Sequence, residues 1–445
     1  MVIRERLRGY LASMTPTAIA SAMRDKWLRQ SLLIATLALC SRSATAQRRP
    51  AGPILPPAGW DSLYRTHRLF ELRDSLRVGK TTVSPSTRFY SGIVAHAFND
   101  NDAAIANLAP LVDSAPRSLT TAQLLAAADA LGDSYRREFR YRESAIVYRT
   151  ALRLSGAGID SATRANFSAW ASIASALAEI SPQHIAWSAE SNNASVANDS
   201  VEWAMVATIN GDTTAAPLAM DAGARLSVLD STTAAAHRVR SLGGPIPTLV
   251  AGHPMDARVG VISALGVGSA TLSNVAVLVV ADDSLRAAYH RARIGGAIGL
   301  PVLSALGTLT LTRDGHIALS SPGADTDSSS VPNIALADGT TIVAATYGGR
   351  RMPVILDPGA NRTLLYPSFL QEFASAASGA RLTTYVGAGL DGAIVSLPAY
   401  VIPDFIVSVN GRTIRLGPVD ALMRNDDPRS QLYFGALGQD ALQSA

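Results

Sequence analysis

Two segments of the chain, 136 residues apart, share one pattern. Residues 217–229 read PLAMDAGARLSVL, and residues 353–365 read PVILDPGANRTLL. Each has a proline four positions before an Asp, a short apolar run, Asp-x-Gly-Ala, and then a hydroxyl residue followed by two aliphatics. The Asp-x-Gly tripeptide recurs by chance, but its long matching context does not. The chain is therefore expected to contain two similar lobes, each presenting one carboxylate, at Asp221 and Asp357.

A second signature follows each Asp at a matching distance. Gly299 lies 78 residues after Asp221 in the stretch IGGAIGLPVL, and Gly438 lies 81 residues after Asp357 in YFGALGQDAL. From about residue 183, short segments rich in Val, Ile and Thr alternate with turn pairs, which predicts antiparallel sheet built from hairpins. The turn pairs are Asn210-Gly211, Asp338-Gly339, Gly348-Gly349 and Asn410-Gly411.

The pattern of apolar residues before residue 183 is different. From about residue 60 to residue 180, apolar residues recur at spacings of three and four, and alanine is frequent. The sequence thus predicts a multidomain α+β protein, in which an α-helical repeat domain precedes a two-lobed all-β domain. The expected parts are a signal peptide (1–46), a Pro-rich spacer (47–59), a helical domain (60–182), a first lobe (183–320), a linker (321–330) and a second lobe (331–445).

Residues 1–46 have the features of an export signal. Arg24, Lys26 and Arg29 precede a short apolar run at 31–40, and an Ala-Thr-Ala cleavage site ends at residue 46. The apolar run is shorter than the ~20 residues that span a bilayer. We therefore expect an exported, bacterial-style protein, periplasmic or extracellular, with no transmembrane segment in the mature chain. An uncleaved amphipathic N-terminus is the alternative.

Composition excludes several classes of site. The leader carries seven Lys/Arg against two acidic residues, so the remaining chain has a net charge near −1 although the whole chain has +4. Nucleic acid as a partner is therefore not expected, since its binding needs a clustered basic face. Cys40, the one cysteine, lies in the leader, so the mature chain is expected to have no thiolate site or disulfide.

The helical part contains a recognisable pattern. It resembles the tetratricopeptide repeat, in which small residues let paired helices approach and aromatics fill the groove. The residues that carry this resemblance are Leu131, Gly132, Tyr135, Tyr141, Ser144, Tyr148 and Ala151, with a weaker unit at Gly92, Ala104, Leu108 and Pro116. Helical hairpins without a repeat register are the alternative. Stacked pairs of this kind usually bind a protein partner, and we expect the Arg-rich run 136–149 to be a solvated helix face.

The duplicated Asp-x-Gly loop with its later apolar-apolar-Gly strand resembles the pepsin and retropepsin family of aspartic proteases. The resemblance covers about 200–442 and implies two lobes with catalytic Asp221 and Asp357. It also implies active-site loops made of Ala222, Gly223 and Ala224 in one lobe and of Pro358, Gly359 and Ala360 in the other. Unrelated β-sandwich or barrel domains, with both Asp residues in ordinary turns, are the alternative.

The chemistry implied by the resemblance needs two carboxylates that share one proton. Like charges so close cannot both ionise, so one member takes a proton from water while the other polarises the scissile carbonyl. No metal or cofactor is required, and none is expected. The seven histidines are scattered, without a His-Glu-x-x-His motif, and are expected to be satisfied or solvated.

The sequence departs from the family at one position in each loop. The family has Thr or Ser in the middle of the tripeptide, and its hydroxyl bonds to the opposite loop, whereas this chain has Ala222 and Pro358. We call this bond between the two loops the hydroxyl lock. Three interpretations follow from its absence: a slow protease, a protease in which another interaction holds the loops together, and a lobe pair kept for binding. The expected function is an aspartic endopeptidase acting on peptides or unfolded proteins. The alternative is a weak or inactive peptide-binding or scaffold module that works with the helical repeats.

A flap over the cleft is a further expectation from the family. The better flap candidate is the stretch 383–389, in which Tyr385 would hydrogen-bond across the cleft, and 242–252 is its counterpart in the first lobe. Plain surface hairpins are the alternative for both stretches.

Overall fold

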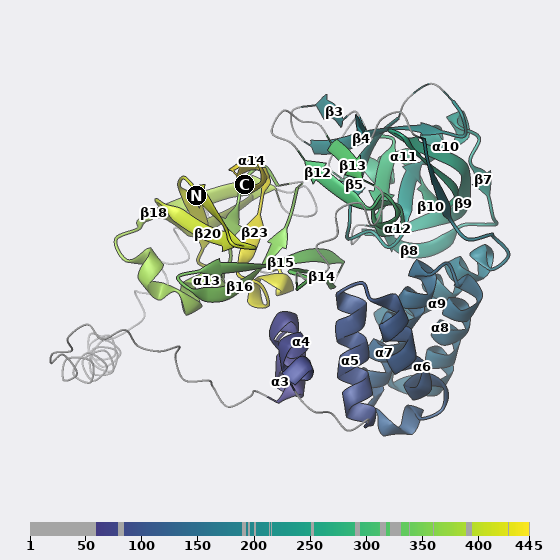
Figure 1. Cartoon of the computed structure of the whole chain (residues 1–445), viewed down its shortest axis with the longest axis horizontal. Helices are drawn as coiled ribbons and strands as arrows, with labels where there is room; N and C mark the ends of the chain where they lie inside the picture. Colours follow the sequence, from purple (N-terminus) through teal and green to yellow (C-terminus); the bar gives the residue numbers. More distant parts are fainter. Residues whose placement is uncertain are drawn as a thin grey trace, which may run out of the picture. The chain divides into compact units, whose positions relative to one another are not determined.

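The computed structural model describes most of the chain beyond residue 58. The described residues are 59–78, 84–188, 193–194, 196–199, 202–212, 214, 216–250, 253–289, 294–311, 317–320, 331–337, 339–358, 360–388, 394–425 and 427–444. The predicted signal peptide, the predicted linker at 321–330, Gly359 and all of the Pro-rich spacer except Gly59 lie outside them. Helices fill the first part of the described chain and strands the second (Figure 1), which confirms the predicted α+β class.

The helical part consists of paired helices. Its bounds are α3 Trp60–Arg65, α4 Leu69–Val78, α5 Pro85–Ala97, α6 Asn101–Asp113, α7 Thr121–Arg137, α8 Tyr141–Ser155 and α9 Ser161–Leu177, with 3-10 turns at Pro116–Ser118 and Gly156–Gly158. Of these helices, α5, α6, α7 and α9 have side-chain caps at their N-termini. The side chains of Ser84, Asp100 and Asp160 accept first-turn N–H groups of α5, α6 and α9. Thr120 and Gln123 form a reciprocal capping box on α7. In the ranges that the structure describes, no helix combines the length and the apolar character needed to cross a bilayer.

Two helical hairpins repeat one close contact. A Cβ at Gly92 of α5 would overlap Leu108 of α6, and a Cβ at Gly132 of α7 would lie 2.7 Å from the ring of Tyr148 on α8. In both hairpins the two residues are 16 positions apart, and the glycines are 40 positions apart. Glycine therefore sets the distance between the paired helices at equivalent places.

The first sheet has ten strands among the described residues. They are β1 His184–Trp187, β3 Val196–Asp199, β4 Glu202–Ile209, β5 Ala216–Asp221, β6 Ser227–Asp230, β7 Arg240–Ser241, β8 Ile246–Val250, β9 His253–Val267, β10 Ala270–Val280 and β11 Gly296–Gly299. Beside it lie helices α10 Ser231–Ala236, α11 Asp282–Tyr289 and α12 Leu300–Ala305, and a small sheet of β2 Asn193–Ala194, β12 Thr308–Leu311 and β13 Ile317–Ser320. The predicted turn at Asn210-Gly211 joins β4 to β5, with positive φ at both residues.

The second sheet also has ten described strands. They are β14 Ile334–Ala337, β15 Thr340–Tyr347, β16 Arg350–Leu356, β17 Leu364–Leu365, β18 Arg381–Ala388, β19 Ile394–Ile402, β20 Phe405–Val409, β21 Arg412–Leu416, β22 Val419–Leu422 and β23 Gly435–Leu437. Helices α13 Pro367–Glu372 and α14 Gln439–Ser444, and 3-10 turns Ala374–Ala377 and Pro428–Gln431, connect them. Gly348-Gly349 and Asn410-Gly411 form the β15–β16 and β20–β21 turns, again with positive φ.

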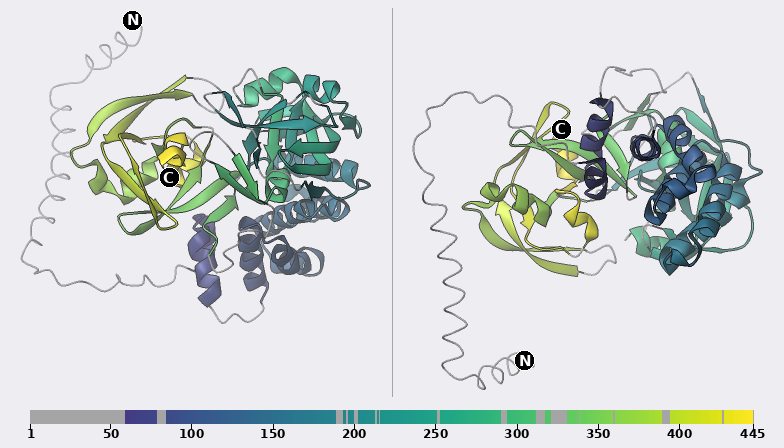
Figure 2. Two further views of the ribbon diagram at one scale, coloured as in Figure 1. Left: turned by 45° about the horizontal axis from the view of Figure 1, so that its top comes forward. Right: turned by 90° about the horizontal axis from the view of Figure 1, so that it is seen from below.

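The central strands of the two sheets pair in the same order and with the same orientations. In the first, β11 lies between β5 and β6, parallel to β5 and antiparallel to β6. In the second, β23 lies between β16 and β17 with the same two senses of pairing. β10 then pairs in parallel with β6, as β22 does with β17. Two further views show that each sheet is formed by one continuous stretch of colour, hence of chain (Figure 2).

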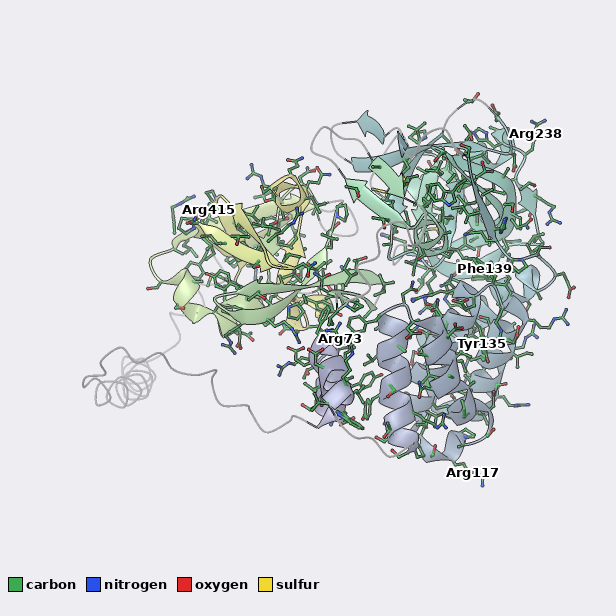
Figure 3. All side chains as sticks on the ribbon, in the orientation of Figure 1. Arg73, Arg117, Tyr135, Phe139, Arg238 and Arg415 are labelled. Carbon is green, nitrogen blue, oxygen red and sulfur yellow. The ribbon has the colours of Figure 1, made fainter. Side chains whose placement is uncertain are left out.

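The helical part shares its buried surface with both sheets. Trp170 and Ile173 of α9 belong to the same hydrophobic cluster as Val250 and Val259 of the first sheet. Leu69 and Phe70 of α4 belong to a cluster with Ile355 of the second sheet and with Tyr366, the N-cap of α13. Arg73 of α4, labelled in Figure 3, also donates to the backbone carbonyl of Pro332. The helices are therefore packed into both β structures through apolar contacts.

Candidate functional site

Asp221 ends β5 and begins a tight turn. Its Cα is in register with that of Gly299 in the parallel β5–β11 pair. Its Oδ1 accepts the N–H of Gly223 at 2.9 Å and the N–H of Ala224 at 3.1 Å. The N–H of Ala224 is also 3.1 Å from the backbone oxygen of Asp221. The turn therefore orients its own carboxylate through backbone donors.

Asp357 begins the equivalent turn of the second sheet. Its N–H donates to the carbonyl of Leu437 at 2.9 Å, and the N–H of Ala360 donates to its backbone oxygen at 3.1 Å. The side chain of Gln439 donates to the carbonyl of Pro358 at 2.9 Å. Gly359, the remaining predicted loop residue, lies outside the described residues.

The hydroxyl residue of the repeated pattern has a definite role in both turns. Ser227 Oγ accepts the N–H of Gly299 at 3.0 Å, and Thr363 Oγ1 accepts the N–H of Gly438 at 3.2 Å. A Cβ at Gly299 would lie 2.6 Å from the backbone of Leu226, so a side chain at this crossing would collide with the turn. The spacing of 78 and 81 residues seen in the sequence thus brings each Asp turn against its glycine strand.

Further backbone bonds occur at equivalent positions. Ala224 O accepts from Leu300 N at 2.9 Å, and Ala360 O accepts from Gln439 N at 2.8 Å. Pro217 O accepts from Gly295 N, and Pro353 O from Phe434 N, both at 3.1 Å. Both Asp residues therefore start a turn that is held by the same set of hydrogen bonds. We call this set, with the hydroxyl-to-glycine bond, the frame.

The first copy of this frame lies in a stretch of sequence that matches a known protein family. Residues 205–302 match the aspartyl protease family model. The match contains both signatures of the first copy, Asp221 and Gly299, so this stretch is an aspartyl protease-like domain. Among curated proteins, no sequence matches the chain. The second sheet carries the same set of hydrogen bonds on residues outside the matched stretch.

The Asp221 turn packs closely against the beginning of the second sheet. A Cβ at Gly223 would overlap the backbone carbonyl of Gly339, which has positive φ in the turn between β14 and β15. Only glycine at position 223 allows this approach of two backbones. The described contacts of this turn thus include a residue 116 positions away, outside the matched stretch.

A cavity of about 320 Å³ adjoins the same turn. Its walls come from the turn, from the β14–β15 region and from helices α3, α4, α5, α7 and α12. Among the residues that line it are Ala222, Gly223, Ala224, Arg225, Ala337, Gly339, Thr340, His96, Asp129, Asp133 and Arg137. The backbone of the Asp221 turn therefore faces both helical and second-sheet residues across one space.

One aromatic and one basic side chain interact electrostatically with Asp357. Burial raises the pKa of Tyr366 to about 12, with a smaller contribution from the nearby Asp357 carboxylate. The pKa of Arg429 is raised, first by its hydrogen bonds to Asp427 and to a lesser degree by Asp357. Tyr366 and Arg429 thus place an aromatic hydroxyl and a cation within electrostatic reach of this carboxylate.

Both flap candidates lie in hairpins. Tyr385 lies in β18, which pairs with β19, and its side chain packs against the cluster that contains Tyr366. Burial raises its pKa, and Asp420 adds to the shift. The described part of 242–252 contains β8, whose Val250 is buried in the cluster shared with α9. Each candidate is therefore packed against a different hydrophobic cluster.

One group of charged residues was missed by the sequence analysis. The Arg-rich run 136–149 was expected to be solvated, which is right for Arg142 and Arg149 but wrong for Arg136, whose side chain is 1% exposed. Arg136 and Asp133 lie at adjacent turns of α7 and are joined by an ion pair. The sequence signal for this group was a pair of acidic residues four positions apart, Asp129 and Asp133, which lie on one face of a helix. Two arginines, Arg136 and Arg137, follow them.

The same group contains a partly buried histidine, His96, whose side chain is 17% exposed. His96 Nδ1 lies 3.1 Å from Ser134 Oγ, and His96 Nε2 lies 3.7 Å from Asp133 Oδ2. Burial lowers the pKa of His96 to about 4, and the guanidinium of Arg137 contributes to this shift against the opposing effect of Asp133. Among the described residues, no set of three or more His, Cys, Asp or Glu side chains is arranged to hold a metal ion.

Proposed function

We propose that the chain is an exported aspartic endopeptidase in which Asp221 and Asp357 together activate water. The observation that carries this proposal is the duplicated frame. Each Asp starts a turn held by a hydroxyl-to-glycine bond, by Ser227 to Gly299 in one copy and by Thr363 to Gly438 in the other. The aspartyl protease match to residues 205–302 supports the same function for the first copy.

The proposed reaction needs one ionised and one protonated carboxyl. The ionised member removes a proton from a bound water as that water attacks the scissile carbonyl. The protonated member donates a hydrogen bond to the carbonyl oxygen and later protonates the leaving amine. The backbone donors at Gly223 and Ala224 contribute by fixing the plane of the Asp221 carboxylate before substrate binds.

Extended peptides or unfolded proteins are the proposed substrates. β18 ends the order of described strands in the second sheet, and Leu382 and Val386 on it are 61% and 63% exposed. Such an edge is suited to pair with an added peptide strand. The two helical hairpins, which we regard as tetratricopeptide-like, would recruit a protein partner or the substrate.

The decisive experiment is cleavage of a mixed peptide library by purified residues 47–445 between pH 3 and pH 7. The Asp221→Asn, Asp357→Asn double variant is the matched control, because the amide keeps the size of the carboxyl but cannot act as the base. We expect acid-dependent, pepstatin-sensitive cleavage that is absent from the variant. Cleavage that persists in a folded double variant would exclude the dyad.

A second function is supported by the middle residues of the two turns. Ala222 and Pro358 lack the hydroxyl that joins the two loops in the family, and proline also lacks the N–H. A catalytically weak peptide-binding module is therefore the competing proposal. It predicts that labelled peptides bind with equal affinity to the wild-type chain and to Asp357→Asn, with no turnover in either.

Export is the proposed localisation, to the periplasm or the extracellular space. The supporting pattern is the charged and apolar leader with Ala-Thr-Ala at 44–46. Fusion of residues 1–50 to a reporter that is active only outside the cytoplasm tests it. Processing after residue 46 is expected, and replacing both alanines of the cleavage site with bulky residues should block it.

A further inference from the structure

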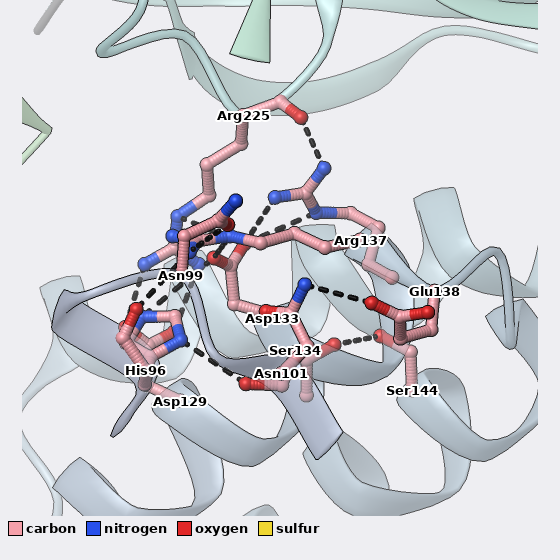
Figure 4. Close-up of polar contacts among 12 residues, drawn as sticks. His96, Asn99, Asn101, Asp129, Asp133, Ser134, Arg137, Glu138, Ser144 and Arg225 are labelled. Atoms are coloured by element: carbon pink, nitrogen blue, oxygen red, sulfur yellow. Dashed lines mark hydrogen bonds and ion pairs between the residues drawn. The ribbon is translucent and has the colours of Figure 1, made fainter. Parts of the chain in front are cut away.

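The residue after the Asp221 turn is fastened to helix α7. The guanidinium of Arg225 makes two parallel hydrogen bonds to Asp129, Nη1 to Oδ1 at 2.9 Å and Nη2 to Oδ2 at 2.6 Å. Arg225 Nη1 also lies 3.2 Å from the hydroxyl of Tyr148. Figure 4 shows this side chain descending from the sheet into the helices. A bidentate, charge-assisted pair of this kind fixes both position and orientation.

Helix α7 returns a bond to the same residue. Arg136 Nη1 donates to the backbone carbonyl of Arg225, and Arg136 is itself held by Asp133. The side chains of Arg136 and Asp133 are each 1% exposed. Both the side chain and the main chain of Arg225 are therefore bound by one face of α7, so Arg225 cannot move without breaking these charged hydrogen bonds.

The charges in this clamp, defined as Asp129, Asp133, Arg136 and Arg225, support one another. Burial acts to raise the pKa of Asp133, but the guanidinium groups around it outweigh burial and hold the pKa well below its usual value. Burial likewise acts to lower the pKa of Arg225, and the two carboxylates raise it well above its usual value. The ring of Trp170 lies 5.3 Å from the Arg225 guanidinium carbon. Each of these two shifts favours the charged form, and the side chains of Arg225 and Asp129 remain 29% and 32% exposed.

The second copy of the turn has no equivalent of this residue. Asn361 occupies the position that corresponds to Arg225, 136 residues later, and it is exposed. The clamp therefore does not belong to the shared frame. It is present at the turn that contains Ala222, one of the two turns whose middle residue lacks the family's hydroxyl.

Hydrogen bonds connect the clamp to the carboxylate over a short path. Arg225 follows Ala224, whose N–H donates to Asp221 Oδ1 and whose carbonyl accepts from Leu300. A shift of Arg225 would move the Ala224 peptide and with it the donor that orients Asp221. We propose that Asp129 and Arg136 of α7 are positioning residues for Asp221, acting through Arg225 in place of the hydroxyl lock; the catalytic part of this inference rests on the proposed function.

The test combines kinetics with amide exchange in residues 47–445. Asp129→Asn keeps the shape of the side chain and removes one charge of the bidentate pair, and Arg225→Lys keeps the charge but removes the fork. Asp74→Asn is the matched control, because Asp74 accepts from Arg351 of β16 at 2.9 Å and so also joins a helix to a sheet, away from this turn. The Ala360 amide in the second turn is an internal reference.

We expect Asp129→Asn and Arg225→Lys to lower kcat by about 10- to 100-fold with KM changed less than about 2-fold, since ~1 Å of misplacement costs roughly that much. The Gly223 and Ala224 amides should exchange at least about 10-fold faster in both variants, with Ala360 unchanged. Asp74→Asn should alter neither the kinetics nor this exchange.

The outcomes separate this inference from the proposed function. Faster exchange at Gly223 and Ala224 in a chain that never cleaves peptides supports the clamp and rejects the protease. Normal exchange together with normal kcat in both folded variants overturns the clamp and leaves the protease intact. An equal loss in Asp74→Asn would show a general effect of helix-to-sheet pairs and would also overturn it.

Discussion

Ser227 Oγ accepts the backbone N–H of Gly299 at 3.0 Å, and this bond ties the strand leaving the Asp221 turn to the strand that crosses behind it. Thr363 and Gly438 repeat the bond in the second sheet at 3.2 Å. The hydroxyl at the end of each repeated segment is therefore part of the frame that holds an Asp turn. Its contribution can be measured in each copy separately.

Replacing Ser227 with alanine should lower the free energy of unfolding by about 1–3 kcal/mol, since the buried Gly299 N–H would lose its acceptor. Thr363→Val should have a similar effect and also lose the bond to Asp440 Oδ1. Urea denaturation measures both. Ser172→Ala, at an exposed serine of α9, is the control and should be nearly neutral. Equal effects at all three positions would contradict the proposed importance of the hydroxyl.

Gly223→Ala should disturb the contact between the two sheets. The added Cβ would lie 2.9 Å from the carbonyl carbon of Gly339, and backbone cannot yield as a flexible side chain can. We expect a loss of about 1–3 kcal/mol in unfolding free energy. Gly417→Ala is the control, because a Cβ there meets nothing within 4 Å. A stable Gly223→Ala variant would show that the turn can separate from Gly339 at little cost.

Gly132→Ala tests the packing of α7 on α8. Replacing glycine with alanine in a helix interior stabilises the fold by about 0.5–1 kcal/mol, so a favourable change is the expectation for an exposed site. Here the Cβ would lie 2.7 Å from the buried Tyr148 ring, and we expect the clash to win with a net loss of about 1–3 kcal/mol. Thermal unfolding checks the sign. Gly158→Ala, with open space at its Cβ, should be neutral, and a stabilised Gly132→Ala variant would refute the close contact.

The pKa of His96 makes stability depend on pH. Because burial lowers it to about 4 from an ordinary value of 6.5, the unfolded chain binds more protons than the folded chain between these values. Stability from this group is complete above about pH 6.5 and declines as pH falls toward 4, by about 2 kcal/mol between pH 7 and pH 5. Urea midpoints at the two pH values should therefore converge in His96→Gln. If the wild type and His96→Gln show the same pH slope, His96 is not the group responsible.

Local patterns in the sequence predicted the two Asp turns and the strands behind them. They did not predict the clamp that holds Arg225 to α7. The duplicated segment at Asp221 and Asp357 and the glycine strands at fixed distances indicated two copies of one turn, because those residues contact each other within one copy. Positive-φ turns such as Asn210-Gly211 were predictable for the same reason, since turn chemistry is local. The α+β class followed from the change in hydrophobic period near residue 183.

The clamp could not be predicted in this way. Arg225 and Asp129 are 96 positions apart and lie in segments of different secondary structure. Periodicity predicted a helix around Arg136 but not which of its faces would meet a sheet, so a buried arginine was expected to be solvated. The contact between Gly223 and Gly339 is equally invisible, because no residue pattern records the approach of two turns. Contacts that depend on docking require the structure.

The burial shared by α9 and the first sheet has a consequence for how the molecule comes apart. Trp170, Phe167 and Val250 occupy one hydrophobic cluster, so the helices and this sheet are expected to melt in a single calorimetric transition. A cut in the 178–183 connection would then yield two fragments that stay associated instead of a liberated β fragment. The boundary predicted from the sequence at residue 183 separates helices from strands. It does not separate two units that unfold independently.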